Sequence, residues 1–91
     1  MKLFVGHIEC KWTHNDRLEL IYYRQKYGDE LFRAINTAGE ITQRRYNSPT
    51  LPQDMYKRVD FFLTPDSSKA ATMFMLRWAE QLEKEDWAHL K

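Results

Sequence analysis

The chain has 91 residues, of which 43% are hydrophobic and 14% aromatic, and 14 Lys and Arg stand against 13 Asp and Glu. This length allows one domain, residues 1–91, with one hydrophobic core, and the apolar content excludes a disordered chain. A formal net charge of +1 does not indicate bulk DNA or an anionic membrane as a partner.

The compartment is predicted from cysteine content and apolar runs. The single cysteine excludes an internal disulfide, so nothing in the composition points to an oxidising compartment. No run approaches the ~18 apolar residues of a membrane span, and the first apolar run ends too early for a signal peptide. We expect a cytoplasmic protein that does not enter a membrane.

The N-terminal segment is predicted to be a strand. Residues 2–12 alternate in polarity, which is typical of a strand with two unlike faces. This alternation places four residues on one face, Phe4, Ile8, Cys10 and Trp12, and places Leu3 and Val5 on the other. A turn-rich tetrapeptide at 13–16 follows.

Residues 17–25 are compatible with two structures. The β-branched and aromatic residues at 21–23 favour a strand. The apolar spacing from Leu18 also fits a helix, which the Asn-Asp pair at 15–16 could cap and Gly28 could end. We favour the strand and leave the helix open.

A hairpin and a further strand are predicted next. Asn-Thr-Ala-Gly at 36–39 has the pattern of a type I turn, so its flanks, 30–36 and 40–46, are expected to pair. Residues 47–54 contain two prolines and are predicted to be a loop, whereas residues 55–63 alternate as a strand does.

The last third of the chain predicts a long amphipathic helix that starts at Thr64 and runs toward Trp87. Thr64 is a suitable cap and Pro65 suits the first helical position. Helical spacing places one apolar stripe on Ala71, Phe74, Met75, Trp78 and Leu82. We predict an α+β two-layer domain: an antiparallel sheet of four to five strands with one C-terminal amphipathic helix packed on one face.

The residues that could support catalysis or metal binding do not form a recognisable motif. His7, Cys10 and His14 suggest a metal site, but residues three apart on a strand point to opposite faces, and zinc needs three or four convergent ligands. Cys10 falls on the expected core face, where thiols are inert. The glycines form no phosphate-binding loop. We predict no enzymatic activity, no metal and no cofactor.

Aromatic and basic residues form the better candidate site. One helix can cover only one sheet face, so the other face is expected to be exposed and rich in Tyr and Arg, the composition of interface cores. We predict that this face binds a partner through Tyr23, Arg44, Arg45, Tyr46, Tyr56 and Arg58. Trp87 or Met73 is the predicted anchor on the helix side. The alternative is an ordinary solvated strand face with charge pairs between strands.

The expected function is binding of a protein partner, with a homodimer as one form of it. In outline the chain resembles small phage-encoded proteins that bind and block host enzymes, including anti-CRISPR proteins, since both combine a short chain, an antiparallel sheet, a helix and no catalytic signature. That resemblance implies an inhibitor, whereas the residues alone allow an inhibitor, an adaptor or a subunit. The alternative function is a module that binds single-stranded nucleic acid with the same Tyr- and Arg-rich face.

Overall fold

The computed structural model describes residues 2–13, 15–52 and 54–82. Three strands and three helices occur in this part of the chain, in the order β1 (Leu3–Lys11), α1 (Asp16–Tyr27), α2 (Asp29–Ala38), β2 (Gly39–Asn47), β3 (Tyr56–Pro65) and α3 (Ser68–Leu82). The protein is therefore of the α+β class with an antiparallel sheet, as predicted. The number of strands and the position of the helices differ from the prediction.

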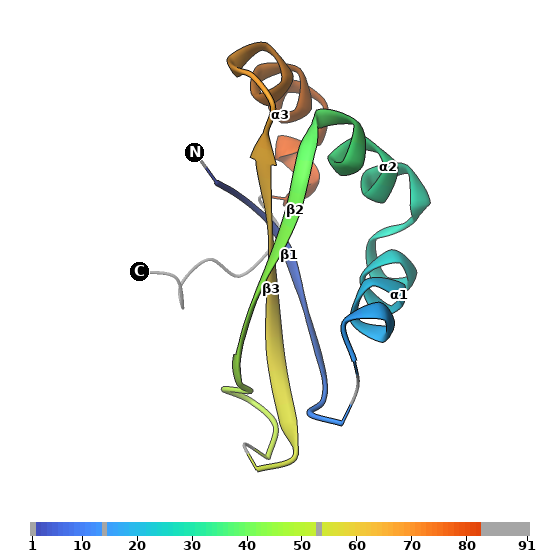
Figure 1. The fold of residues 1–91 in the computed structure, drawn as a ribbon, viewed down its shortest axis with the longest axis vertical. Helices are drawn as coiled ribbons and strands as arrows, with labels where there is room; N and C mark the ends of the chain where they lie inside the picture. The colour runs from blue at the N-terminus through green and yellow to red at the C-terminus, as the bar shows by residue number, and fades with distance from the viewer. Residues whose placement is uncertain (1, 14, 53, 83–91) are drawn as a thin grey trace.

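The sheet has the order β1-β3-β2, and β3 pairs with both neighbours in the antiparallel sense. β1 and β2 are thus the two edges, and the two-helix connection between them packs on one face of the sheet (Figure 1). α3 follows β3 and lies at the end of the sheet beside α2 (Figure 1). We call the face away from α1 and α2 the open face, because these two helices do not lie on it. This face was expected to be exposed throughout, but Phe4, Arg58 and Asp60 on it are buried.

The segment expected as a second strand is helix α1. The Asn15 side chain accepts a hydrogen bond of 3.0 Å from the backbone N–H of Leu18, which caps the helix. At the other end the N–H of Gly28 donates to the carbonyl of Arg24, and Gly28 has a φ of 96°. These end signals outweigh the strand preference of residues 21–23, because that preference is weak and depends on context.

The predicted hairpin of 30–36 with 40–46 is also wrong. Residues of α2 that are buried recur at helical spacing, namely Leu31, Ile35 and Ala38. Gly39 ends this helix, and the chain continues directly into β2. The pairing that forms instead is between β2 and β3, which follow each other in the chain and run antiparallel. The expected sheet of four to five strands with a single C-terminal helix is therefore replaced by three strands and three helices.

The last helix starts later than predicted. Thr64 and Pro65 belong to β3, and the Ser67 hydroxyl oxygen accepts a hydrogen bond of 3.1 Å from the N–H of Ala70. Of the predicted stripe, Ala71, Phe74 and Trp78 are buried, whereas Met75 is 40% exposed. The continuation toward Trp87 lies outside the described residues.

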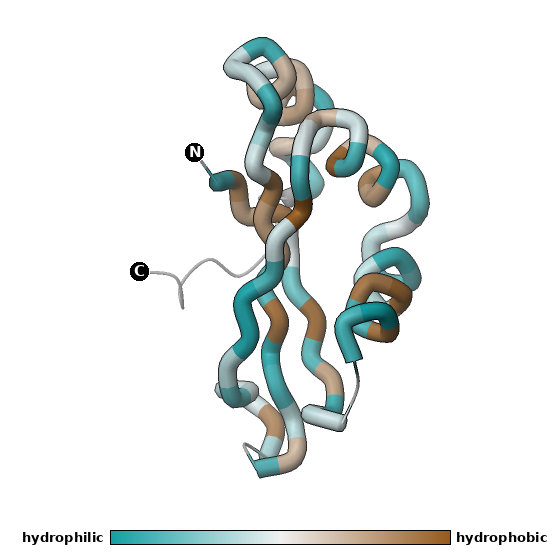
Figure 2. Tube along the Cα trace, in the orientation of Figure 1, coloured by the Kyte–Doolittle hydropathy of each residue, from teal (hydrophilic) through white to brown (hydrophobic). Residues whose placement is uncertain are grey.

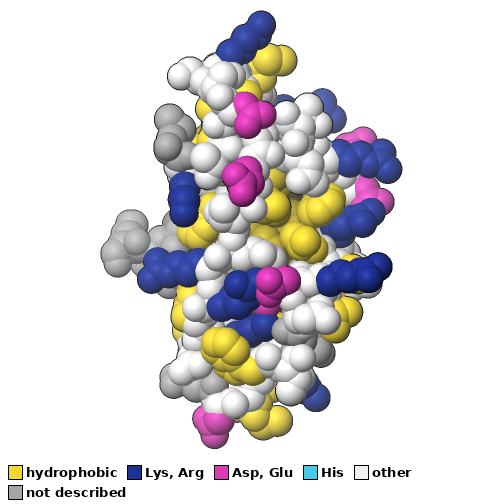
Figure 3. Space-filling model, in the orientation of Figure 1, with side chains coloured by type: hydrophobic (Ala, Val, Ile, Leu, Met, Phe, Trp, Pro, Cys, Tyr) yellow, Lys and Arg dark blue, Asp and Glu magenta, His cyan; other side chains and the backbone are white. Residues whose placement is uncertain are grey.

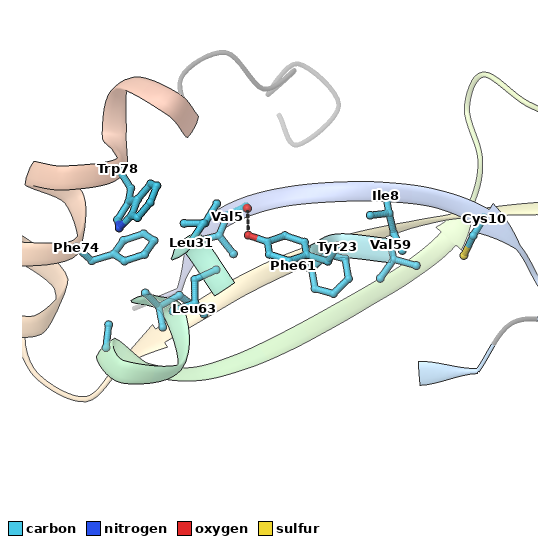
Figure 4. Close-up of a cluster of buried hydrophobic side chains, with 12 residues drawn as sticks. Val5, Ile8, Cys10, Tyr23, Leu31, Val59, Phe61, Leu63, Phe74 and Trp78 are labelled. Atoms are coloured by element: carbon cyan, nitrogen blue, oxygen red, sulfur yellow. Dashed lines mark hydrogen bonds between the residues drawn. The ribbon is translucent and has the colours of Figure 1, made fainter. Parts of the chain in front are cut away.

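The core lies between the sheet and the three helices. Figure 4 shows side chains from β1, α1, α2, β3 and α3 meeting there, with Tyr23 beside Phe61 at 4.5 Å between ring centroids. Figure 2 shows the matching hydrophobic segments along the strands and the helices that face them. Both Tyr23 and Phe61 have no exposed surface. The amphipathic helix face and the alternating strands thus form one core, as the sequence pattern indicates.

A β-bulge in β1 changes which residues of that strand enter the core. The pairing with β3 shifts between Phe4 and His7, at Gly6, which has a φ of 118°. As a result Val5 and Ile8 both join the core cluster, although they are three residues apart. Phe4 lies instead against Phe62, 5.7 Å away between ring centroids. The sequence pattern therefore assigned Phe4 and Val5, which precede the bulge, to the wrong faces of the sheet. It assigned Ile8 and Cys10, which follow the bulge, correctly to the core face.

Replacing Tyr23 by Phe tests the polar contact inside this core. The Tyr23 hydroxyl donates a buried hydrogen bond of 2.6 Å to the carbonyl of Val5 (Figure 4). We expect Tyr23→Phe to lower the free energy of unfolding by about 1–3 kcal/mol, because the carbonyl remains buried and loses this donor. Urea denaturation followed by circular dichroism measures the effect. Tyr56→Phe, at a partly exposed position, is the control and should stay within about 0.5 kcal/mol of the unmodified protein.

Candidate binding surface

The open face of the sheet carries a compact polar network. Arg58 and Asp60 alternate with the core residues of β3 and so point to the open face. The Arg58 Nε donates to Asp60 Oδ1 at 2.9 Å, and the Tyr46 hydroxyl donates to Asp60 Oδ2 at 2.8 Å. Arg58 is only 4% exposed and Asp60 is fully buried. Burial, together with the hydrogen bond to Asp60, raises the pKa of Tyr46 above its usual value, so this phenol is a neutral donor.

A second network lies on the opposite, helix-covered side. Glu19 of α1 is fully buried. Its two carboxylate oxygens share the Nε–H of Arg45 at 3.0 and 2.9 Å, and Oε1 also accepts a hydrogen bond of 2.6 Å from Arg45 Nη2. Lys57, also buried, forms an ion pair with the same carboxylate. Asp16 adds an exposed contact of 2.6 Å to Arg45 Nη2. This network joins α1 to β2 and β3, so its position between three elements indicates a role in stability.

The structure divides the predicted Tyr and Arg set between different environments. Adjacent strand residues point to opposite faces, so Arg45 faces the helices while Arg44 and Tyr46 face the open side. Tyr23 is fully buried on α1 and has no surface for a partner. We therefore withdraw Tyr23 as a contact residue.

Of the remaining predicted contact residues, only some have side-chain surface exposed for a partner. Arg44 is exposed, with its guanidinium 5.9 Å from the Tyr46 ring centroid. Tyr56 is partly exposed and lines an open hollow beside β1 together with Lys11. Trp87 lies outside the described residues. Arg45 and Arg58 are paired internally, Arg45 with Glu19 of α1 and Arg58 with Asp60 of its own strand. Neither is the pair between strands on a solvated face that the alternative expected.

The outer side of α3 exposes more large apolar side chains than the sequence pattern led us to expect. Leu76 is 83% exposed, Met73 61% and Met75 40%. Their positions lie away from Phe74 and Trp78, which enter the core. We call Met73, Met75 and Leu76 the α3 surface. Met73 was predicted as an anchor; Leu76 also lies off the predicted stripe but was not chosen as an anchor.

Two hollows flank the α3 surface. The first, of about 320 Å³, lies between α2 and α3 and has Met73 and Trp78 among its lining residues. The second, of about 360 Å³, is lined by Leu3, Met75 and Leu76 among others. Met73 lines the first hollow, and Met75 and Leu76 line the second, so exposed apolar side chains of α3 border both hollows. A surface of this shape can receive apolar side chains from another molecule.

The described residues give little support for a reactive thiol, a metal site or a membrane-spanning helix. Burial raises the pKa of the Cys10 thiol, and the more weakly acting charges around it do not reverse this, so the thiol stays protonated at neutral pH. Residues 2–13, 15–52 and 54–82 contain no group of three or more His, Cys, Asp or Glu arranged to hold a metal ion. None of their helices is long and apolar enough to cross a membrane.

Comparison with known protein families, with curated proteins and with solved structures gives no significant match. The function is therefore argued from the residues and their geometry alone.

Proposed function

We propose that this protein is a binding domain that holds a protein partner on the α3 surface. The single observation that carries the proposal is the exposure of three large apolar side chains, Leu76, Met73 and Met75, on the part of α3 that faces away from the core. Large apolar side chains exposed together on one element often mark an interaction site. Inhibitor, adaptor and subunit are three forms of such binding, and the identity of the partner distinguishes them.

The chemistry of the α3 surface suits an apolar segment of a partner. Methionine is unbranched and polarisable, so Met73 and Met75 can adapt to the shape of a partner side chain. Fully burying a Leu or Met side chain contributes about 1.5–3 kcal/mol, so Leu76 offers the largest gain because it is the most exposed of the three. Charged residues lie at the rim: Arg77 forms an ion pair with Glu30 of α2 at 3.8 Å. An apolar centre with a charged rim is the usual anatomy of a protein interface.

The nucleic-acid alternative draws less support from the geometry. Binding of this kind depends on unpaired cationic side chains that neutralise phosphates. Arg58 donates to buried Asp60, and Arg45 donates to buried Glu19. Among the Arg residues of the predicted set, Arg44 is thus the one whose charge is exposed. We therefore propose protein binding, and the test below has nucleic-acid binding as its contrary outcome.

The test is affinity capture from a lysate of the cells that make the protein, with and without nuclease treatment. Leu76→Glu should weaken partner binding by at least about 30-fold, the loss expected at the centre of an interface. Its stability should change by no more than about 0.5 kcal/mol, because the side chain is exposed. The matched control is Arg44→Glu, a charge change on the open face. It should leave capture unchanged.

The opposite pattern would contradict the proposal. If nuclease treatment and Arg44→Glu both abolish capture while Leu76→Glu has no effect, then the open face binds nucleic acid. A steep loss of affinity with rising salt would support that outcome, because counterions are released when phosphates are bound.

A further inference from the structure

Strand β2 leaves one side of its backbone without a strand partner among the described residues. β3 lies on its inner side, and the sheet ends at β2. In Figure 1 β2 passes in front of β3, with its outer edge toward the viewer. Figure 3 shows the same side of the molecule with basic, acidic and hydrophobic side chains on its surface. An edge of nine residues is long enough to pair with another strand.

The hydrogen bonds at both ends of the β2–β3 ladder show which residues of β2 direct their backbone outward. The Asp66 N–H donates to the Ala38 carbonyl at 2.9 Å, and the Ser48 N–H donates to the Tyr56 carbonyl at 3.1 Å. The register between these two pairs is continuous. Because hydrogen-bonded and non-hydrogen-bonded pairs alternate in an antiparallel ladder, even-numbered residues of β2 bond to β3. The odd-numbered residues, Ile41 and Gln43 among them, direct their N–H and carbonyl groups to the free edge.

The position of a proline supports this assignment. Pro65 lies opposite Gly39, at an odd-numbered position of β2. A proline has no N–H to donate, so it fits a pair that makes no hydrogen bond within the ladder.

We propose that the free edge of β2 pairs with β2 of a second copy of this chain in the antiparallel sense, centred on Thr42. In this register Ile41 of each copy lies opposite Gln43 of the other, and both present outward backbone groups as a hydrogen-bonded pair requires. The two three-stranded sheets then form one continuous sheet, with the helices of both copies on the same face.

Charge complementarity selects the second copy and this register. Glu40, Thr42 and Arg44 share the open face, and Glu40 and Arg44 are exposed. With Thr42 opposite Thr42, Glu40 of each copy lies opposite Arg44 of the other, and the pair occurs twice by symmetry. Residues directly opposite in such pairs have Cβ atoms about 4.5–5.5 Å apart, within reach of an ion pair. Shifting the register by two residues in either direction removes both of these charge pairs.

Charge exchange tests the pairing. Sedimentation equilibrium of the full chain should show a monomer–dimer equilibrium, and Arg44→Glu should weaken dimerisation about tenfold or more, because two ion pairs become two repulsive pairs. The double variant Glu40→Arg/Arg44→Glu should restore the dimer, since it exchanges the charges and keeps their complementarity. Leu76→Glu is the matched control and should leave the dimer unchanged. A wild-type chain that stays monomeric at millimolar concentration would overturn the proposal, and so would a double variant as weak as Arg44→Glu.

A backbone variant provides an independent measurement. Gln43→Pro removes an outward N–H and keeps the hydrogen bonds of β2 with β3, so it should abolish dimerisation while circular dichroism shows a folded chain. Thr42→Pro removes an inward N–H that the ladder with β3 uses, so it should destabilise the fold itself. A folded Gln43→Pro variant that dimerises as the wild type does would refute pairing along this edge. The proposal is independent of the α3 surface, because its variants and those of Leu76 are measured by different readouts.

Discussion

Replacing Glu19 by Gln is expected to lower the free energy of unfolding by about 3–5 kcal/mol, because it leaves buried positive charge without its counter-charge. The Glu19 carboxylate is fully buried and forms ion pairs with Lys57, whose side chain is 4% exposed, and with Arg45. A neutral amide cannot balance these two cations. Urea denaturation of the purified variant at neutral pH measures the loss.

Asp16→Asn is the matched control, because Asp16 contacts the same Arg45 nitrogen but has a side chain that is 77% exposed. We expect a change of no more than about 1 kcal/mol there, since water screens exposed ion pairs. The double variant Glu19→Gln/Lys57→Met should recover part of the loss, because it removes the unpaired buried cation. A Glu19→Gln variant as stable as Asp16→Asn would contradict a stabilising role for this network.

The same carboxylate predicts how stability depends on pH. Burial alone would raise the pKa of Glu19, but hydrogen bonds and charge from Arg45 and Lys57 outweigh it and lower the pKa below the ordinary 4.5. The folded state therefore binds this proton less readily than the unfolded state does. The stabilisation is complete above about pH 4.5 and is lost as the pH falls through the lower pKa of the folded state. The difference between wild type and Glu19→Gln should accordingly shrink as the pH is lowered below 4.5.

Replacing Gly6 by Ala is expected to have the second large effect. The positive φ of 118° is unfavourable for an L-residue, at a cost of about 1–3 kcal/mol. A Cβ at this position would also lie 2.5 Å from Cζ of the Tyr27 ring, and overpacking of this kind costs about another 1–3 kcal/mol. The ring has little room to move, because the Tyr27 hydroxyl accepts a hydrogen bond of 3.0 Å from the His7 N–H. Thermal and urea denaturation measure the total loss of stability from backbone strain and overpacking.

Gly28→Ala separates the two causes. Gly28 also has a positive φ, of 96°, but a Cβ there would meet no atom within 4 Å. It should therefore show only the backbone strain of about 1–3 kcal/mol. Equal losses for Gly6→Ala and Gly28→Ala would show that Tyr27 moves aside without cost.

The strands that could be predicted were those with two unlike faces. Residues 2–12 and 55–63 alternate in polarity, and they correspond to β1 and β3. β2 was predicted as the second half of a hairpin; the strand itself is present, but its partner is β3. Alternation identifies a strand because the pleat repeats every two residues, yet it does not say which strand is the neighbour.

Of the two helices before β2, α2 was missed and α1 was kept only as the less favoured alternative, for a physical reason. Local preferences at 21–23 and at 36–39 favour a strand and a turn. In α1 the Asn15 cap outweighs this preference. In α2, which has no side-chain cap, the buried face of Leu31, Ile35 and Ala38 outweighs it. Gly39, assigned to a turn, ends a helix instead. Gly28, noted as a possible terminator of the helical alternative, has that role at the end of α1.

The predicted binding residues also show what a local sequence pattern leaves undetermined. Arg45 and Arg58 look equally exposed in the sequence, but each donates to a buried carboxylate that lies distant in the sequence or on the same strand. Whether a charge is paired depends on which elements pack together. Leu76, in contrast, could be identified as an exposed apolar residue from its position off the buried stripe of its helix.

By itself the sequence determined the α+β class, β1, β3 and the burial of Phe74 and Trp78, because these follow from the period of apolar residues along one element. Only the tertiary structure decided the sheet order, the bulge at Gly6, the internal pairing of the arginines and the free edge of β2. Each of these depends on contacts between segments far apart in the chain, which a local pattern does not contain.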